Sequence, residues 1–195
     1  MFDPRRPTVL IVDKPWYRKL FRPRQKLDLE TTPARADHGD AGAQFRLGLK
    51  YANGAGAARD YEQAAAWYLK AAEQNHPLAQ LNLGVLYARG QGVPKDDARA
   101  AMWIQKAAQQ GAAEAQFNLG MRHYRLMIEA RSKDVPESKL EAYKWLHLAA
   151  AQGFEGSAAA CDCVTMVMTR EEVADGNQRL AAFAAGHSDH PQVQP

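Results

Sequence analysis

The chain has 195 residues, of which 46% are hydrophobic and 24% charged, and its formal net charge is +3. A chain of this length and composition is expected to fold as one domain. It has no apolar stretch near the roughly 20 residues that span a bilayer, and its N-terminus lacks the pattern of a secretory signal. We therefore expect a cytoplasmic protein without a transmembrane segment.

Residues 1–39 form a basic, aromatic N-terminal arm, with nine Lys and Arg against five Asp and Glu. Its charge is concentrated in residues 14–26, which contain no acid. The basic and aromatic residues there are Lys14, Trp16, Arg18, Lys19, Phe21, Arg22, Arg24 and Lys26. Such an arm could cap one end of the helical array described below, bind an anionic membrane surface or bind nucleic acid. We favour the cap, in which case the arm would be partly ordered.

A motif recurs along the rest of the chain with a fixed period. In residues 79–111 it reads Ala-x-x-x-Leu-Gly-x-x-Tyr, then Gly-x-Gly, an Asp, Ala-x-x-Trp-x-x-x-Ala-Ala and a final Gly. The same residues occur 36 positions earlier, except that the final Gly is replaced by Asn75, which tolerates the same left-handed conformation. The motif occurs in part again downstream. A period in this range is the signature of a stacked repeat array. We assign the repeats to residues 40–75, 76–111 and 112–153.

Each repeat is predicted to contain two helices. Leu83, Leu86 and Tyr87 are spaced to line one face of the first helix, and Gly84 suggests a close approach of another helix. The Gly-x-Gly pair should end that helix. The second helix should begin at an N-cap residue, namely Asp60, Asp96 and, in a capping box with Glu141, Ser138.

The third repeat departs from the pattern. Leu126 and Ile128 replace the two turn glycines, and Trp103 and Trp145 are 42 residues apart instead of 36. The first helix is therefore expected to continue to about residue 130. A loop at 131–137 would then hold the insertion, either as a harmless longer turn or as part of a binding face.

Residues 154–186 are predicted to form a C-terminal cap of two helices. Thr169 and Glu172 form a capping box that would open the last helix at about residue 171. Val173, Leu180 and Phe183 would form its inner face. The preceding helix contains Cys161 and Cys163, which point apart and are expected to be two buried free thiols. Residues 187–195 are polar and expected to be disordered.

The repeated motif closely resembles the Sel1-like repeat (SLR), a relative of the tetratricopeptide repeat. The resemblance covers about residues 40–183, most of the chain. It implies an all-α fold, a short right-handed α-solenoid of about three helix-turn-helix repeats followed by the capping helix pair. It also implies a role in binding protein partners.

No catalytic constellation is visible in the sequence. There is no phosphate-binding loop or dinucleotide fingerprint, no nucleophile elbow, and no His or Cys pair at metal-ligand spacing inside a helix. We therefore expect no enzymatic activity and no cofactor or metal.

The leading hypothesis is a non-enzymatic adaptor that binds a protein or peptide on the concave face of the solenoid. The tetratricopeptide repeat relatives use the first helices of successive repeats for this purpose. The corresponding positions here are Phe45, Arg46, Leu81, Asn82, Phe117, Asn118 and Arg122, with Leu49, Val85 and Met121 beside them. The phenylalanine and leucine positions could instead be core. The alternative hypothesis is a module that acts on a membrane or on nucleic acid through the arm at residues 14–26.

Overall fold

All regular structure in the described part of the chain is α-helical, as predicted. The computed structural model describes residues 32–55, 58–129 and 135–187. The predicted arm at residues 14–26 therefore lies outside the described residues. The helices are α2 (Thr32–Asp37), α3 (Ala41–Asn53), α4 (Tyr61–Glu73), α5 (Pro77–Arg89), α6 (Asp97–Gln109), α7 (Ala113–Glu129), α8 (Val135–Ala151), α9 (Ser157–Thr165) and α10 (Arg170–His187).

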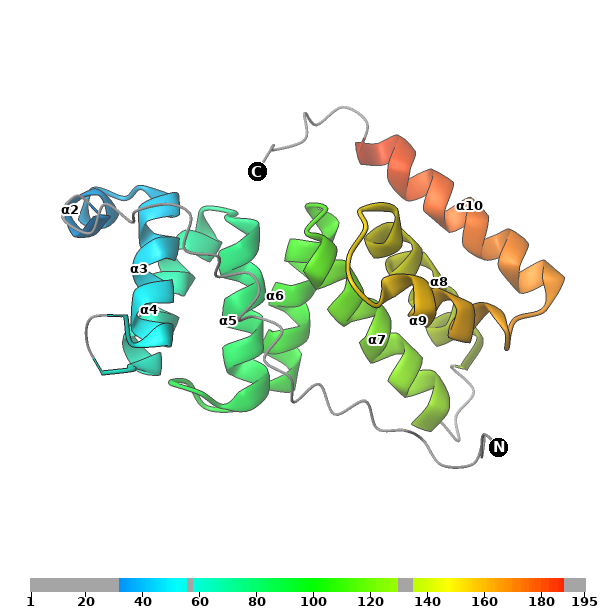
Figure 1. The fold of residues 1–195 in the computed structure, drawn as a ribbon, viewed down its shortest axis with the longest axis horizontal. Helices are drawn as coiled ribbons and strands as arrows, with labels where there is room; N and C mark the ends of the chain where they lie inside the picture. The colour runs from blue at the N-terminus through cyan, green and yellow to red at the C-terminus, as the bar shows by residue number, and fades with distance from the viewer. Residues whose placement is uncertain (1–31, 56–57, 130–134, 188–195) are drawn as a thin grey trace. The chain divides into compact units, whose positions relative to one another are not determined.

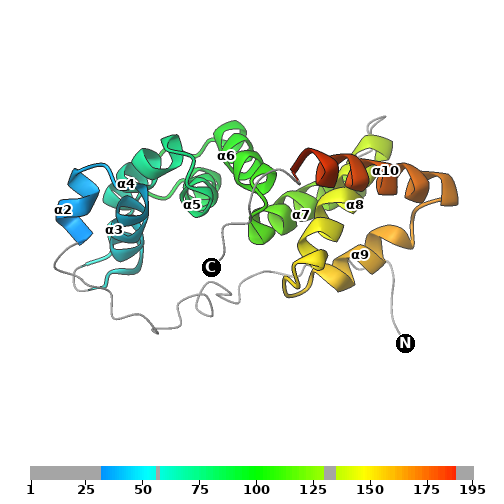
Figure 2. The same cartoon turned by 90° about the horizontal axis from the view of Figure 1, so that it is seen from above.

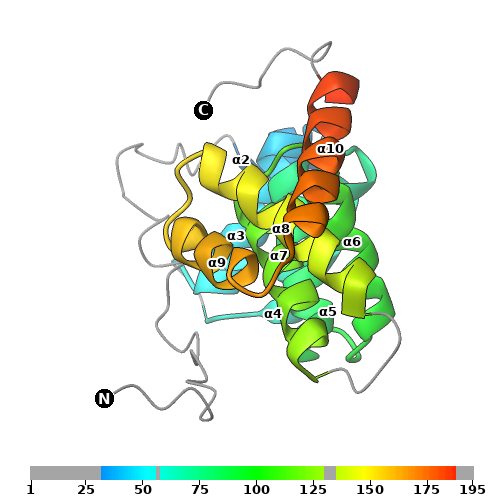
Figure 3. The ribbon, with the colours of Figure 1, turned by 90° about the vertical axis from the view of Figure 1, so that its right-hand side faces the viewer.

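The helices pack in chain order as three helix pairs, α3 with α4, α5 with α6 and α7 with α8 (Figures 1 and 2). Each pair packs against the next, α2 packs on α3, and α9 packs on α8. Helix α10 lies across α8 (Figure 3). This is the predicted array of helix-turn-helix repeats, a short all-α solenoid. Because α2 belongs to it, the array starts before the predicted boundary at residue 40.

A glycine marks the point where the two helices of each pair cross. A Cβ atom added to Gly84 would lie 2.7 Å from Ile104 Cγ1, and one added to Gly120 would lie 2.7 Å from Leu146 Cγ. Gly48 has the same relation to the ring of Tyr68. Real Cβ atoms do not approach so closely, so only glycine allows this helix spacing. The Leu-Gly pair of the motif therefore encodes the packing inside a repeat.

The ends of the helices follow the motif in the first two repeats. The carboxylates of Asp60 and Asp96 accept hydrogen bonds from the backbone N–H groups of the first turns of α4 and α6, at 2.9–3.0 Å. Gly90 ends α5 with φ of 65°, in the left-handed region that favours glycine. Asn75 adopts φ of 63° after α4, as predicted.

The predicted start of α8 is wrong. The helix begins at Val135, so Ser138 lies within it and cannot cap it. Glu141 accepts hydrogen bonds from Trp145 Nε1 and Lys144 Nζ instead of from a helix end. Residues 135–137, which we expected in a loop, are helical, and residues 131–134 lie outside the described residues.

Paired glutamines link each repeat to the one before it. Gln80 Nε2 donates to the carbonyl of Ala72 at the end of α4, at 3.1 Å, and Gln80 Oε1 accepts from Gln110 Nε2 at 2.6 Å. The pairs Gln44–Gln74 and Gln116–Gln152 repeat this arrangement. The amide of the first glutamine is buried in all three repeats. A buried polar group is stable only when it is hydrogen bonded, so these contacts fix the alignment of neighbouring repeats.

The C-terminal helices agree with the prediction in most respects. Thr169 and Glu172 form the reciprocal bonds of a capping box at the start of α10. Val173, Leu180 and Phe183 pack against the core. Both cysteines are free, but only Cys161 is buried; Cys163 is exposed, contrary to prediction. Helix α10 includes His187, and the remainder of the predicted tail lies outside the described residues.

Candidate partner-binding face

One face of each first helix points away from the second helix of its own repeat. Positions two residues from the crossing glycines are rotated by about 200° from them, which places Arg46 and Asn82 on this face. Residues three, four and seven positions away share it. We call it the first-helix face. Its members are Gly42, Arg46, Leu49, Lys50 and Asn53 on α3, Leu78, Asn82, Val85, Leu86 and Arg89 on α5, and Glu114, Asn118, Met121, Arg122 and Arg125 on α7. Leu86 is buried.

Side chains of α3 reach the core of the next repeat at the edge of the first-helix face. Phe45 and Leu49 of α3 pack against the core cluster that contains Leu83 and Leu86 of α5. The ring of Phe45 also stacks on His76 at 4.6 Å between centroids. Phe45 is thus half-buried where the two repeats meet, with Arg46 beside it.

His76 is the N-cap of α5, a role that we did not predict from the sequence. Its Nδ1 atom accepts a hydrogen bond from the backbone N–H of Ala79 at 3.3 Å. Burial lowers the pKa of His76, and the charge of Arg46 adds to this. A neutral imidazole keeps Nδ1 free to accept, so the cap depends on the deprotonated side chain.

On α5, the predicted residues divide between core and surface. Leu81 is only 2% exposed and belongs to the core, so it has almost no surface to offer a partner. Asn82 is half-buried, and its Nδ2 donates to the carbonyl of Leu78 in the same helix at 2.8 Å. Leu78 itself is 43% exposed. The sequence pattern did not single out Leu78 as a surface residue.

On α7, neighbouring residues cover part of the same face. Phe117 packs against Phe154 with ring centroids 5.1 Å apart, and Met121 contacts the cluster that includes Cys161 of α9. The Nδ2 atom of Asn118 is buried without a hydrogen-bond partner. Of the predicted residues on α7, only Arg122 is exposed. On α7 the part of the first-helix face at Asn118 and Met121 is therefore partly covered, whereas Arg122 and Arg125 stay exposed.

Burial also affects Glu114, at the start of α7. It raises the pKa of this carboxyl group to about 7. A carboxyl group with this pKa is partly protonated near neutral pH, so it adds little negative charge to the first-helix face.

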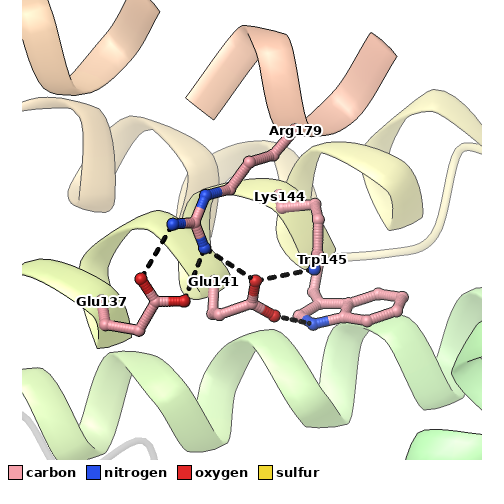
Figure 4. A network of polar contacts seen from close by, with 5 residues as sticks. All are labelled: Glu137, Glu141, Lys144, Trp145 and Arg179. Carbon is pink, nitrogen blue, oxygen red and sulfur yellow. Dashed lines mark hydrogen bonds and ion pairs between the residues drawn. The ribbon is translucent and has the colours of Figure 1, made fainter. Parts of the chain in front are cut away.

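A polar network attaches α10 to α8 (Figure 4). The guanidinium of Arg179 binds both carboxylate oxygens of Glu137, at 2.6 and 2.8 Å, and reaches Glu141 at 3.1 Å. Burial tends to raise the pKa of Glu141, but its bonds to Lys144 and Trp145 hold it below the ordinary value. Each charge in this network has a partner, so we interpret the network as structural.

Other kinds of site have little support in the described residues. Across residues 32–55, 58–129 and 135–187, no group of three or more His, Cys, Asp and Glu side chains is arranged to hold a metal ion. In the same ranges, no helix is both long and apolar enough to cross a membrane. The eight basic and aromatic arm residues, from Lys14 to Lys26, lie outside the described residues and stay a prediction.

Comparison with known proteins identifies the repeat. The Sel1 repeat family profile matches residues 41–76, 77–111 and 113–154. The crystal structure of a Sel1 repeat protein from Oxalobacter formigenes is 36% identical, with a TM-score of 0.57, over 69% of this chain and 97% of that protein. A protective antigen from uropathogenic Escherichia coli strains, which displays an SLR fold, is 23% identical with a TM-score of 0.49, over 86% of this chain and 44% of that protein. No curated protein matches the chain.

Proposed function

The chain belongs to the Sel1 repeat family, and we propose that it is a non-enzymatic scaffold that binds a protein or peptide on its first-helix face. Sel1 repeats are commonly protein–protein interaction modules. The observation that carries the proposal is the difference between two sides of the same helices. The side of α3 and α5 next to α4 and α6 is closed by glycine contacts, whereas the other side carries exposed or half-buried polar and apolar residues.

The open side has the composition of a peptide-binding surface. Arg46 and Asn82 occupy equivalent positions one repeat apart, and both can hydrogen bond to a peptide backbone or side chain. Leu78 lies one helical turn before Asn82 and supplies exposed apolar area. Binding sites of this kind combine apolar contact with a few placed polar groups. A partner that crosses from α3 to α5 would contact all three residues.

Selection from a library of random 12-residue peptides would test the proposal. Peptides selected on the intact protein should bind a variant with Arg46→Ala and Asn82→Ala at least roughly tenfold more weakly, the loss expected for central interface contacts. The matched control replaces two exposed residues of α6, Gln105→Ala and Gln109→Ala, and should bind unchanged. Circular dichroism and thermal melting would show that each variant is folded.

Two results would contradict the proposal. The proposal fails if selection enriches no peptide, because the face then has no general affinity for polypeptide. It also fails if the enriched peptides bind both variants equally, because the binding surface then lies elsewhere on the protein.

A further inference from the structure

The first helices of the first two repeats have an unbalanced charge. Helices α3 and α5 contain Arg46, Lys50 and Arg89 and no Asp or Glu. The second helices are mixed, since α4 has Glu62 and Glu73 beside Lys70, and α6 and α8 also contain both signs. All three cations of α3 and α5 lie on the first-helix face. Positive charge is therefore concentrated on the surface proposed to bind a partner.

These three cations also have no ion-pair partner in the described part of the chain. The ion pairs among the described residues lie elsewhere and are Arg35–Asp40, Lys95–Asp97, Arg99–Asp96, Lys139–Glu172, Lys144–Glu141, Arg179–Glu137 and Arg179–Glu141. Arg122 and Arg125, on the same face of α7, and Arg59 and Arg170, outside it, are likewise exposed without an ion pair in this part of the chain. The carboxylate that Arg46 influences is that of Asp40, which already accepts hydrogen bonds from Arg35 and from the backbone of Ala43. The positive charge of the face is thus left for a ligand.

Apolar surface lies between the cations. Leu78 is exposed, and Leu49 and Val85 are half-buried at the edges of the core. The face offers no exposed ring for base stacking, because Phe45 is stacked on His76. Stacking platforms are the usual companion of positive charge in proteins that bind single-stranded nucleic acid. The combination of cations with aliphatic contacts fits a polypeptide better than a nucleic acid.

We propose that the partner segment is acidic, with Asp or Glu carboxylates placed against Arg46, Lys50 and Arg89 and an apolar side chain against Leu78. This inference rests on the function proposed above and specifies the chemistry of its ligand. On α7, α9 packs near Met121 and Phe154 packs on Phe117, beside the face, whereas Arg122 and Arg125 stay exposed. Complementary charge of this kind mainly confers specificity and fast association.

The test measures fluorescence anisotropy of labelled probes bound to the full chain. The first probe is a 12-residue peptide that alternates Glu and Leu, the second has Gln in place of every Glu, and the third is a 12-nucleotide oligothymidylate. The acidic peptide should bind at least roughly tenfold more tightly than its Gln counterpart. Its affinity should fall with added salt because the contacts are exposed.

Two charge-reversal variants separate a specific site from general attraction. The triple variant Arg46→Glu, Lys50→Glu and Arg89→Glu should bind the acidic peptide roughly tenfold or more weakly. The control triple variant Arg59→Glu, Lys95→Glu and Arg170→Glu changes the net charge equally at exposed positions outside the face and should change affinity by less than about twofold. Thermal melting of both variants checks that they are folded.

Several outcomes would overturn the inference. It fails if the Gln peptide binds as tightly as the Glu peptide, if both triple variants lose affinity equally, or if the oligonucleotide binds more tightly than the acidic peptide. If library selection yields peptides that need Arg46 and Asn82 but contain no excess of acid, the acidic partner is wrong and the proposed function stands. If selection yields no peptide for the face, both are wrong.

Discussion

The second and third repeats contain the same motif and use it differently. In the second repeat, the ring of Trp103 is covered by its own helix through the ammonium of Lys106, 4.7 Å from the ring centroid. In the third repeat, Phe183 of α10 contacts Trp145 edge-on at 5.3 Å. Arg99 on α6 is replaced at the equivalent position of α8 by Glu141, which α10 binds through Arg179. At these positions the third repeat packs against the C-terminal helix α10, and the second repeat does not.

The first helices show the same contrast. On α5, Leu78 and Arg89 of the first-helix face are exposed and Asn82 is half-buried. On α7, the Nδ2 atom of Asn118 is buried without a hydrogen-bond partner and Met121 packs toward α9, whereas Arg122 and Arg125 stay exposed. In a short array the last repeat thus acts partly as a cap, because a terminal repeat has no successor to cover it. We therefore place the proposed binding surface mainly on the first two repeats.

The largest expected effect comes from the tryptophans. Trp145→Ala and Trp103→Ala should each lower the free energy of unfolding by about 3–5 kcal/mol, because both rings are buried. Trp67 is only partly buried, so Trp67→Ala should lower it by about 1–2 kcal/mol. Urea denaturation measures all three. A silent Trp145→Ala would mean that α10 does not depend on this ring.

The glutamine pairs should contribute equally to stability in the second and third repeats. Gln80→Ala and Gln116→Ala each remove a buried amide that donates to the carbonyl of Ala72 or Ala108 and accepts from Gln110 or Gln152. Each should lower the free energy of unfolding by about 1–3 kcal/mol, and by similar amounts. Thermal melting of the two variants checks this. A large difference between them would show that the link between repeats does not have the same strength along the array.

The polar network around Glu141 should contribute more to stability than an exposed ion pair of the second repeat. Glu141→Ala removes the acceptor of Trp145 Nε1 and one partner of Arg179, and should lower the free energy of unfolding by about 1–2 kcal/mol. The control Lys95→Ala removes an exposed pair with Asp97 and should change it by less than about 0.5 kcal/mol. Equal effects, measured by urea denaturation, would contradict a structural role specific to α8 and α10.

The smallest effect depends on pH and compares the starts of α5 and α7. Glu114 holds a proton more tightly in the folded protein, with its pKa raised from 4.5 to about 7, so its stabilising contribution is present below pH 4.5 and lost as the pH rises through 7. Glu114→Gln should therefore raise the free energy of unfolding by about 1 kcal/mol at pH 8 and not at pH 4.5.

The contribution of His76 to stability should depend on pH in the direction opposite to that of Glu114. Burial lowers its pKa, so the unfolded chain binds the proton first, and its contribution to stability is present above pH 6.5 and lost as the pH falls below that value. His76→Asn keeps an N-cap residue without a titratable group and should reduce the loss of stability between pH 6.5 and 5. Denaturation curves at several pH values test both variants. A variant curve parallel to that of the intact protein would contradict the assigned shift.

Much of the fold could be predicted from the sequence because its signals are local and repeat. The 36-residue spacing, the Leu-Gly pair and Asp96 as an N-cap each specify one helix or one turn. The prediction that Ser138 caps α8 is wrong for a physical reason. The capping-box pattern is local, but Glu141 is bound by Trp145 and by Arg179 from another helix. No local pattern contains that information.

The candidate binding site could be predicted from the sequence less well than the fold. The spacing placed Phe45, Leu81 and Phe117 at equivalent positions, but burial depends on what packs beside each one. Phe45 stacks on His76, Leu81 enters the core and Phe117 lies under Phe154. The recurrence of Gln44, Gln80 and Gln116 was visible in the sequence, yet their partners appear only when the helices are placed together. The partner-binding role of the face stays a prediction.

The most direct test of the account is a ¹H–¹⁵N chemical-shift map of the intact protein titrated with the alternating Glu–Leu peptide. The account predicts shifts concentrated in α3 and α5, around Arg46, Leu78, Asn82 and Arg89, with α4, α6, α8 and α10 nearly unchanged. Shifts centred on α8 and α10, or spread evenly over all helices, would contradict it, because the open first-helix face would then not be the binding surface.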